Sequence, residues 1–320
     1  MSSMENNWRV PLIAAIAPIA WGSGYYVTAH FLPPDRPLFA AAVRALPVGL
    51  LLLAWTRQLP RGVWWWRAGL LGTLNVGLFF PLIFLAGYRL PGGLAATMTA
   101  TAPIMVALVA WALIAERPRA VSLAAAVVGA GGVALLVLKG GVSPDPVGVA
   151  AALGAVTLSS FGFVLVKRWH PPVGMLTFAA WQLVAGGIVL VPVAVLVEGA
   201  PPALDARAVG GFLYMGLVAT GLAYVAWFTG LRRMPAGAVA LIGLLNPVAG
   251  VVIGVLLAGE VFGPVQALGM LLVLGGVLAG QPAVQDGVRG LLAGRAAGTA
   301  VTTGRPATDA EEVDEPVRAA

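Results

Sequence analysis

Residues 89–118 read RLPGGLAATMTATAPIMVALVAWALIAERP, and residues 233–262 read RMPAGAVALIGLLNPVAGVVIGVLLAGEVF. The two stretches match without a gap at a constant offset of 144 residues. The matched positions are Arg89 and Arg233, Pro91 and Pro235, Gly93 and Gly237, Pro103 and Pro247, and Glu116 and Glu260. Nearer the N-terminus the offset falls to 138, so that Arg44 corresponds to Gln182. The chain therefore contains two copies of one structural plan.

The composition is that of a membrane protein. Hydrophobic residues make up 59% of the chain and charged residues 10%, and the mean hydropathy is +0.92. Soluble domains carry about 25% charged residues. The net charge of +6 comes from basic residues that occur singly or in pairs between apolar stretches, which indicates membrane topology signals and no nucleic-acid partner. The absence of cysteine excludes disulfides and thiolate chemistry.

Apolar stretches of about 20 residues, the length that crosses a bilayer as a helix, occur ten times. We place them at about 10–29, 37–56, 68–88, 92–115, 119–138, 147–166, 173–197, 208–231, 236–258 and 263–282. With a cytoplasmic N-terminus, ten Lys and Arg fall in the short inner segments and four in the outer ones. This bias predicts that both termini are cytoplasmic.

Ten spans divided between two copies give five spans each, and an odd number forces the second copy to enter the membrane upside down. The sequence therefore predicts an all-α integral membrane protein of ten transmembrane helices, arranged as two inverted five-helix repeats. The predicted repeats are residues 10–138 and 147–282, joined by a linker at 139–146 and preceded by a cytoplasmic N-terminus at 1–9. Residues 283–320 are rich in small, polar and acidic side chains, which predicts a disordered cytoplasmic tail.

The paired prolines and glutamates, together with AWGSGYYV at residues 20–27, resemble the EamA family of the drug/metabolite transporter superfamily. The resemblance covers about residues 11–282. PPDRP, the basic residue within the second span and the LLNPV and GE segments are similar to the PecM-like branch of small-metabolite exporters. The resemblance implies export of amino acids or other small polar metabolites from bacterial cells across the inner membrane.

Arg44 is the basic side chain placed well inside a predicted span. A charge at that depth is costly and marks a functional or tightly paired site. Its guanidinium could bind a substrate carboxylate, donate to the carbonyls of a broken helix, or extend towards the outer interface. Gln182, at the equivalent position, keeps a hydrogen-bonding group without the charge, which favours a substrate with one anionic end.

Aromatic and uncharged polar residues recur at helical spacing in the spans and could line a cavity of modest polarity. The alternative is that they pack and join helices. The candidate substrate-binding residues are Trp21, Tyr25, Arg44, Asn75, Phe79, Thr101, Trp181, Gln182, Tyr224 and Asn246.

Two further pairs of matched residues suggest mechanical roles. Pro103 and Pro247 bend their spans and are candidate gating hinges, or else static bends. Glu116 and Glu260 each lie 25 residues after the proline that opens the span, roughly 37 Å at 1.5 Å per residue, and so belong at the membrane edges. There we expect each of them to cap the next helix or to pair with a nearby arginine.

Three functions remain open from the sequence. An alternating-access exporter of a small-molecule substrate, in contact with membrane lipids, accounts for the repeat best. A proton-coupled drug exporter is disfavoured, because no predicted span carries a carboxylate in its middle. A membrane-embedded enzyme is disfavoured because His30 and His170 fall on opposite predicted sides. We expect no cofactor and no metal; a monomer suffices for this cycle, and a homodimer stays open.

Overall fold

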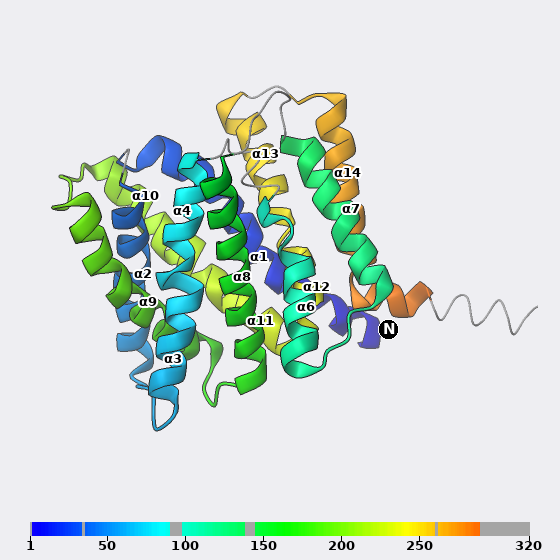
Figure 1. Cartoon of the computed structure of the whole chain (residues 1–320), viewed down its shortest axis with the longest axis horizontal. Coiled ribbons are helices and arrows are strands. Elements are labelled where there is room, and N and C mark those ends of the chain that lie inside the picture. Colours follow the sequence, from blue (N-terminus) through cyan, green and yellow to red (C-terminus); the bar gives the residue numbers. More distant parts are fainter. Residues whose placement is uncertain (1, 34–35, 90–97, 138–144, 260–261, 289–320) are drawn as a thin grey trace, which may run out of the picture.

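The computed structural model describes residues 2–33, 36–89, 98–137, 145–259 and 262–288. All regular structure in these residues is helical, and the helices form one bundle (Figure 1). The helices of the first half are α1 (Ser2–Phe31), α2 (Pro37–Thr56), α3 (Trp64–Gly72), η1 (Thr73–Gly77), α4 (Phe79–Arg89), α6 (Ala102–Ile114) and α7 (Ala120–Val137). Those of the second half are α8 (Pro146–Trp169), α9 (Met175–Glu198), α10 (Ala206–Gly216), η2 (Leu217–Leu222), α11 (Ala223–Arg233), α12 (Ala236–Ile242), α13 (Leu245–Ala258) and α14 (Pro264–Ala279).

Each predicted span coincides with helix, but not every one is long enough to count as a membrane span. Among the described residues, seven helical stretches are long and apolar enough to cross a bilayer. The bent pair Pro264–Ala279 and Pro282–Val288 raises the number to eight if it forms one span. The predicted fourth and fifth spans contain the shorter apolar helices Ala102–Ile114 and Ala120–Leu136, and residues 90–97 and 138 lie outside the described part. The count of ten and the cytoplasmic termini therefore stay predictions.

Equivalent helices of the two halves pack against each other in opposite directions. In the pair α2 and α9, a Cβ on Gly49 would lie 2.8 Å from the Val184 nitrogen, and one on Gly187 would lie 2.7 Å from the Leu46 Cβ. Residue numbers thus rise along α2 as they fall along α9. The same holds for α7 and α14, where Gly132 meets Gly269 and Gly276 meets Ala125 (Figure 1). Glycine at these positions lets the backbones approach closely.

The remaining contacts between the halves also correspond. α1 packs on α13, as α8 packs on α6. α1 packs on α11 as well, and α8 packs on α4 in the same way. Exchanging the two halves therefore converts each of these four helix contacts into another of the four.

Both halves contain a π-helical turn at the same place. η1 begins at Thr73 and η2 begins at Leu217, which is the offset of 144 found in the sequence. The Leu78 N–H donates to the Thr73 carbonyl at 2.7 Å, and the Thr220 hydroxyl donates to the Met215 carbonyl at 2.8 Å. A π turn holds an extra residue and often occurs at functional sites. The two predicted spans that contain these turns therefore each carry a π turn in the middle while staying helical.

The two candidate hinge prolines lie at helix starts. Pro103 follows the first residue of α6, and Pro247 is in the first turn of α13, after a break at Gly243 and Leu244 that ends α12. An N–H in the first turn has no partner within its own helix, so proline costs little there. The prolines therefore begin a second helical segment and do not bend a continuous helix as the sequence suggested. Their role as gating hinges stays a prediction.

Glu116 ties the end of α6 to the other half. Its Oε1 accepts a hydrogen bond of 2.9 Å from the backbone N–H of Ala236, the first residue of α12. Its Oε2 forms an ion pair with Lys167 near the end of α8. Glu116 therefore caps a helix, but this helix is α12 of the other half and not the next helix along the chain, and its ion pair is with a lysine in place of the expected arginine. Glu260 lies outside the described residues.

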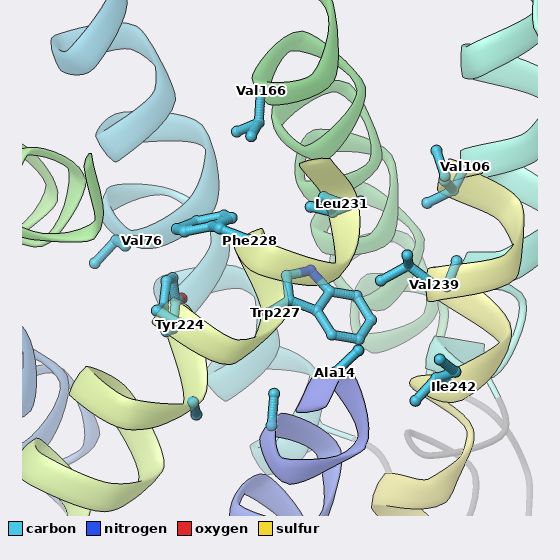
Figure 2. Close-up of a cluster of buried hydrophobic side chains, with 14 of the residues drawn as sticks. Ala14, Val76, Val106, Val166, Tyr224, Trp227, Phe228, Leu231, Val239 and Ile242 are labelled. Atoms are coloured by element: carbon cyan, nitrogen blue, oxygen red, sulfur yellow. The ribbon is translucent and has the colours of Figure 1, made fainter. Parts of the chain in front are cut away.

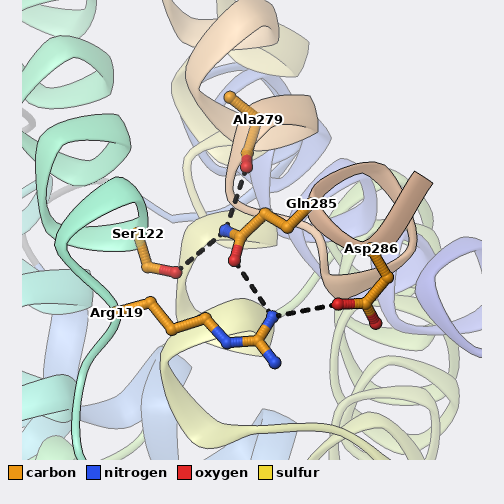
Figure 3. Close-up of polar contacts among 5 residues, drawn as sticks. All are labelled: Arg119, Ser122, Ala279, Gln285 and Asp286. Carbon is orange, nitrogen blue, oxygen red and sulfur yellow. Dashed lines mark hydrogen bonds and ion pairs between the residues drawn. The ribbon is translucent and has the colours of Figure 1, made fainter. Parts of the chain in front are cut away.

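The chain stays helical beyond residue 282, where the sequence placed the start of the tail. Pro282–Val288 form a short helix at 75° to α14. Figure 3 shows Gln285 between Arg119 and Ser122 of the first half, with hydrogen bonds of 3.1 Å to each. Arg119 also forms an ion pair of 3.5 Å with Asp286. The folded part of the chain thus extends six residues past the predicted boundary, and residues 289–320 lie outside the described part.

Candidate functional site

Two polar pairs join the halves where the π turns meet α2 and α9. The Arg44 Nε of α2 donates to the Thr220 Oγ1 of η2 at 3.1 Å. The Asn75 Nδ2 of η1 donates to the Gln182 Oε1 of α9 at 2.7 Å. Arg44 and Gln182 are equivalent positions, and Asn75 and Thr220 both belong to π turns. Each pair therefore links one half to the other. Exchange of the halves relates the two pairs approximately, because Asn75 corresponds to Ala219, the residue before Thr220.

Arg44 is held between a hydroxyl and an aromatic ring. Its Cζ lies 4.3 Å from the centre of the Phe80 ring, close enough for a cation–π interaction. Thr220, its hydrogen-bond partner, is fully buried. The Arg44 side chain is partly exposed. This setting fixes the position of the guanidinium, whose fork of donors suits a carboxylate.

The pair of Asn75 and Gln182 lies in the interior. Their exposed fractions are 2% and 0%, and the hydroxyl of Tyr224 donates to the Asn75 carbonyl at 3.0 Å. The Asn75 Oδ1 and the Gln182 Nε2 have no hydrogen-bond partner, although both atoms are buried. Leaving such a group unpaired costs about 1–3 kcal/mol. One acceptor and one donor are thus left unpaired in the interior at this point.

The two halves differ in the space beside their π turns. A Cβ on Gly162 of α8 would lie 1.9 Å from the Asn75 Oδ1. A Cβ on Gly24, the equivalent position in α1, would lie 3.4 Å from the Met215 sulfur. Only glycine at position 162 leaves room for Asn75 in this conformation.

Aromatic rings from α1, α8 and α11 form a wall close to the polar pairs. The Trp21 ring centre lies 5.3 Å from that of Trp227 and 6.1 Å from that of Tyr224, and the Phe163 ring lies 5.5 Å from Trp227. Figure 2 shows Tyr224 on the side of Val76 and Trp227 turned towards Ala14 and Val239. The Nε1 atoms of Trp21 and Trp227 are buried without a hydrogen-bond partner.

Trp21, Arg44, Asn75, Gln182 and Tyr224 therefore meet in one region, as expected of a shared site. Asn246 lies beside this region. Its backbone oxygen would be 2.5 Å from a Cβ on Gly22, the residue after Trp21, and its Oδ1 is buried without a hydrogen-bond partner. Whether these residues bind substrate stays a prediction.

The other candidate residues have local roles in the structure. The Trp181 Nε1 donates to the Gln58 carbonyl at 2.6 Å and so anchors the loop after α2. The Thr101 hydroxyl donates to the Met98 carbonyl at 2.6 Å, just before α6. The Phe79 ring lies 5.7 Å from that of Phe80. Tyr25 belongs to α1, but its side chain lies outside the described part.

Phe80 was not among the candidates, although the sequence contained a signal for it. It is 144 residues before Tyr224 and so occupies the equivalent place in the first half. Thr220 is four residues before Tyr224, and this spacing puts the two residues on one face of the helix. The structure adds that the Thr220 hydroxyl accepts a hydrogen bond from Arg44.

An apolar groove of about 410 Å³ lies between α2 and α10, outside this region. Its lining includes Val43, Val48, Phe212 and Leu213. Val48 is one helical turn beyond Arg44, and its methyl groups would meet a Cβ on Gly216 at 2.6 Å. The groove thus borders the candidate site without reaching the charged group. Among the described residues no group of three or more His, Asp and Glu could hold a metal ion.

The family model of the EamA-like transporter family matches residues 8–138 and 146–279. These ranges correspond to the two halves found by the repeat. The chain belongs to the EamA-like transporter family. As a member of it, with several helices able to cross a bilayer, it is a multi-pass membrane protein.

Relatives of this EamA-like transporter match most of its length. Protein PecM of Dickeya dadantii strain 3937 is 38% identical over 268 residues, covering 83% of this chain and 90% of PecM. The uncharacterized transporter YwfM of Bacillus subtilis strain 168 is 31% identical, covering 83% and 92%. The uncharacterized inner membrane transporter YedA of Escherichia coli K12 is 29% identical, covering 84% and 90%.

One solved crystal structure superimposes on the chain with a TM-score of 0.75 at 19% sequence identity. The match covers 87% of this chain and 98% of that one. At this level of identity the likeness concerns the fold alone.

Proposed function

We propose that this EamA-like transporter is a secondary transporter that exports amino acids or similar small metabolites by alternating access. The observation that carries the proposal is the crossed arrangement of Arg44 with Thr220 and of Asn75 with Gln182. Each pair spans the boundary between the halves at a π turn within a helical span. Secondary transporters bind substrate between their repeats, and π turns often occur at functional sites.

The packing of the halves supports an inverted repeat. α2 runs antiparallel to its equivalent α9, and α7 runs antiparallel to its equivalent α14. Two similar bundles of opposite direction can exchange conformations and open a shared site to each side of the membrane in turn. In this cycle the contacts of Glu116 with Lys167 and Ala236 hold the halves together at one end.

The difference between the two halves supports a substrate with one carboxylate. Arg44 supplies a positive group, and Gln182 at the equivalent position is neutral. A guanidinium binds a carboxylate with two parallel hydrogen bonds. The free Asn75 Oδ1 and Gln182 Nε2 would bind an uncharged or cationic polar group, and the Trp21 and Trp227 rings an apolar part. An amino acid combines all three.

The positions of the carboxylates favour this function over proton-driven drug export. Glu116, Asp145, Glu198 and Asp205, among the described acids, lie at or beyond helix ends. A drug–proton antiporter normally needs an acid within the membrane. A location in a bacterial inner membrane is supported by the likeness to YedA, a protein named for that membrane. We propose that the protein is not an enzyme and that one copy suffices.

The test compares amino acids with their amides in proteoliposomes. Wild-type protein should carry the acid in preference to the amide, and Arg44→Gln should remove that preference while still carrying the amide. Arg44→Lys, which keeps the charge but not the fork of donors, should retain part of it. Unchanged preference in Arg44→Gln would contradict the role of Arg44. Failure of wild-type protein to carry any amino acid would contradict the substrate class.

A second measurement addresses the energy source. The pH gradient is collapsed while the membrane voltage is held constant. Transport should continue, since no carboxylate in the middle of a described span is present to titrate. Loss of transport would favour the proton-coupled alternative.

A further inference from the structure

Arg67 lies in α3 with its guanidinium among three tryptophan rings. The Cζ atom is 5.4 Å from the centre of Trp64, 5.9 Å from Trp66 and 5.1 Å from Trp169 at the end of α8. The rings of Trp66 and Trp169 also meet each other edge to face at 5.1 Å. The guanidinium is thus held in one place by two helices that belong to different halves.

This positive charge has no anionic partner in the described part of the chain. The Arg67 Nε is buried without a hydrogen-bond acceptor, and no ion pair of Arg67 is formed with any described residue. The sequence contains no Asp or Glu between residues 36 and 115. Glu116, the next carboxylate along the chain, is paired with Lys167. A partly buried cation without a counter-ion is unfavourable, so an external anion would stabilise it.

The exposed stretch of chain that leads to Arg67 is both basic and apolar. We call it the Trp–Arg rim, and it consists of Trp55, Arg57, Leu59, Arg61, Val63, Trp65, Trp66 and Arg67. The three tryptophans of the rim are 81%, 59% and 54% exposed, and Leu59 and Val63 are 58% and 44% exposed. Arg57 and Arg61 are exposed as well. A group of exposed, large apolar side chains marks a surface that another apolar phase covers, and here that phase is the membrane.

The position of the rim indicates the membrane interface. It lies between the candidate spans Pro37–Thr56 and Trp64–Ile83, at the ends where α2 stops and α3 starts. The loop is fixed there, because Trp181 holds Gln58 and the Trp64 N–H donates to the Arg61 carbonyl at 3.1 Å. Tryptophan is enriched at this depth, where lipid headgroups meet the acyl chains.

We propose that the Trp–Arg rim binds an anionic phospholipid, with the phosphodiester on Arg67 and the acyl chains along the exposed tryptophans. Arginine forks match phosphate oxygens, and stacking on the rings holds the fork ready for binding. Arg57 and Arg61 favour a lipid with net negative charge over a zwitterionic one, because residues 36–115 contain no Asp or Glu that could neutralise their charge. The site is separate from the region of Arg44 and independent of the transported substrate.

The test uses the purified full-length protein in detergent, titrated with phosphatidylglycerol, phosphatidylcholine or free glycerol 3-phosphate. Bound lipid is counted by native mass spectrometry, and Tm is followed in parallel. Phosphatidylglycerol should bind saturably and raise Tm more than phosphatidylcholine does. Glycerol 3-phosphate should leave Tm unchanged, because it lacks the acyl chains that contact the tryptophans. Equal binding of the two lipids, or an equal effect of the free phosphate, would overturn the proposal.

Variants locate the site. Arg67→Gln should weaken phosphatidylglycerol binding about tenfold, the loss expected for hydrogen bonds to a charged group. Arg207→Gln removes the same charge from an exposed position in α10, where the guanidinium stacks on Phe31, and should leave binding unchanged. If Arg67→Gln does not fold, the exposed double change Arg57→Gln and Arg61→Gln should reduce the preference for phosphatidylglycerol in its place. Equal losses in the rim variants and in Arg207→Gln would indicate a general charge effect and overturn the proposal.

Discussion

Asn75 and Gln182 are joined by a hydrogen bond of 2.7 Å that crosses from one half of the chain to the other. Exchanging the halves puts this contact next to the one between Arg44 and Thr220, because Asn75 corresponds to Ala219. The same place in the fold thus holds an uncharged amide pair on one side and a charged group with a hydroxyl on the other. The predictions below test what these and neighbouring contacts contribute.

The amide pair should show a measurable coupling energy. Asn75→Ala, Gln182→Ala and the double change form a cycle in which each single change leaves the partner unpaired. Hydrogen bonds between membrane helices contribute on the order of 1 kcal/mol, so we expect a coupling of that size in the free energy of unfolding. Denaturant unfolding in mixed micelles measures it. Strictly additive single effects would show that the two amides do not interact.

Gly162→Ala should destabilise the protein, whereas Gly24→Ala should not. The added Cβ at position 162 would lie 1.9 Å from the Asn75 Oδ1 and push the amide away from Gln182. At position 24 it would lie 3.4 Å from a flexible methionine. We expect a loss of about 1–3 kcal/mol for the first change, the usual cost of overpacking. Similar midpoints of thermal unfolding for the two variants would contradict this account.

Glu116 should matter more as a helix cap than as half of an ion pair. Glu116→Gln removes the charge from the pair with Lys167 but keeps an oxygen for the Ala236 N–H. Because both side chains are partly exposed, we expect a loss of at most about 1 kcal/mol. Glu116→Ala also removes the cap and should cost about 1 kcal/mol more. Unfolding of the two variants side by side separates the effects, and a larger loss in Glu116→Gln would reverse the assignment.

Asp145 should make the stability of the N-terminus of α8 depend on pH in the acid range. The hydrogen bond from the Gly148 N–H, then those from Val147 and the charge of Arg89, hold the pKa of Asp145 below its ordinary value of 3.8. The carboxylate therefore stabilises the folded state above that ordinary pKa, and the effect is lost as the pH falls through the lower folded pKa.

Asp145→Asn is the matched variant for this test, because asparagine also caps helices but does not titrate. Wild-type protein should lose more stability than the variant when the pH is lowered from 5 to about 2. Thermal unfolding over this range gives the comparison. Parallel curves for the two proteins would show that Asp145 does not titrate in this way.

The sequence predicted those parts of the fold that depend on repeated local patterns. The length of the apolar stretches located the helices. The repeat, at its offset of 138 residues, matched Arg44 with Gln182, and each of these two residues takes part in one of the polar pairs. The π turns could not be predicted, because η1 and η2 have no residue pattern that distinguishes them from ordinary helix. The partner of Asn75 was also hidden, since Gln182 lies 107 residues away and only packing brings the two together.

For Trp181 the sequence suggested a shared site that the structure does not form. Trp181 adjoins Gln182 in the sequence, which made it a natural candidate for the same site. On a helix, however, neighbouring residues point in directions about 100° apart. Its indole therefore reaches the loop at Gln58, while the side chain of Gln182 reaches Asn75.

The inequality of Arg44 and Gln182 also bears on the history of the chain. Two identical half-length proteins that assembled as a pair would carry the same residue at both places. Arginine in one half and glutamine in the other can be encoded only when the halves are separate stretches of coding sequence that mutate independently. The matching π turns are features that such an ancestral pair could already have had. Such a pair could not have carried the single charge of Arg44 in one half alone. Specialisation for an unsymmetrical substrate therefore became possible only after duplication.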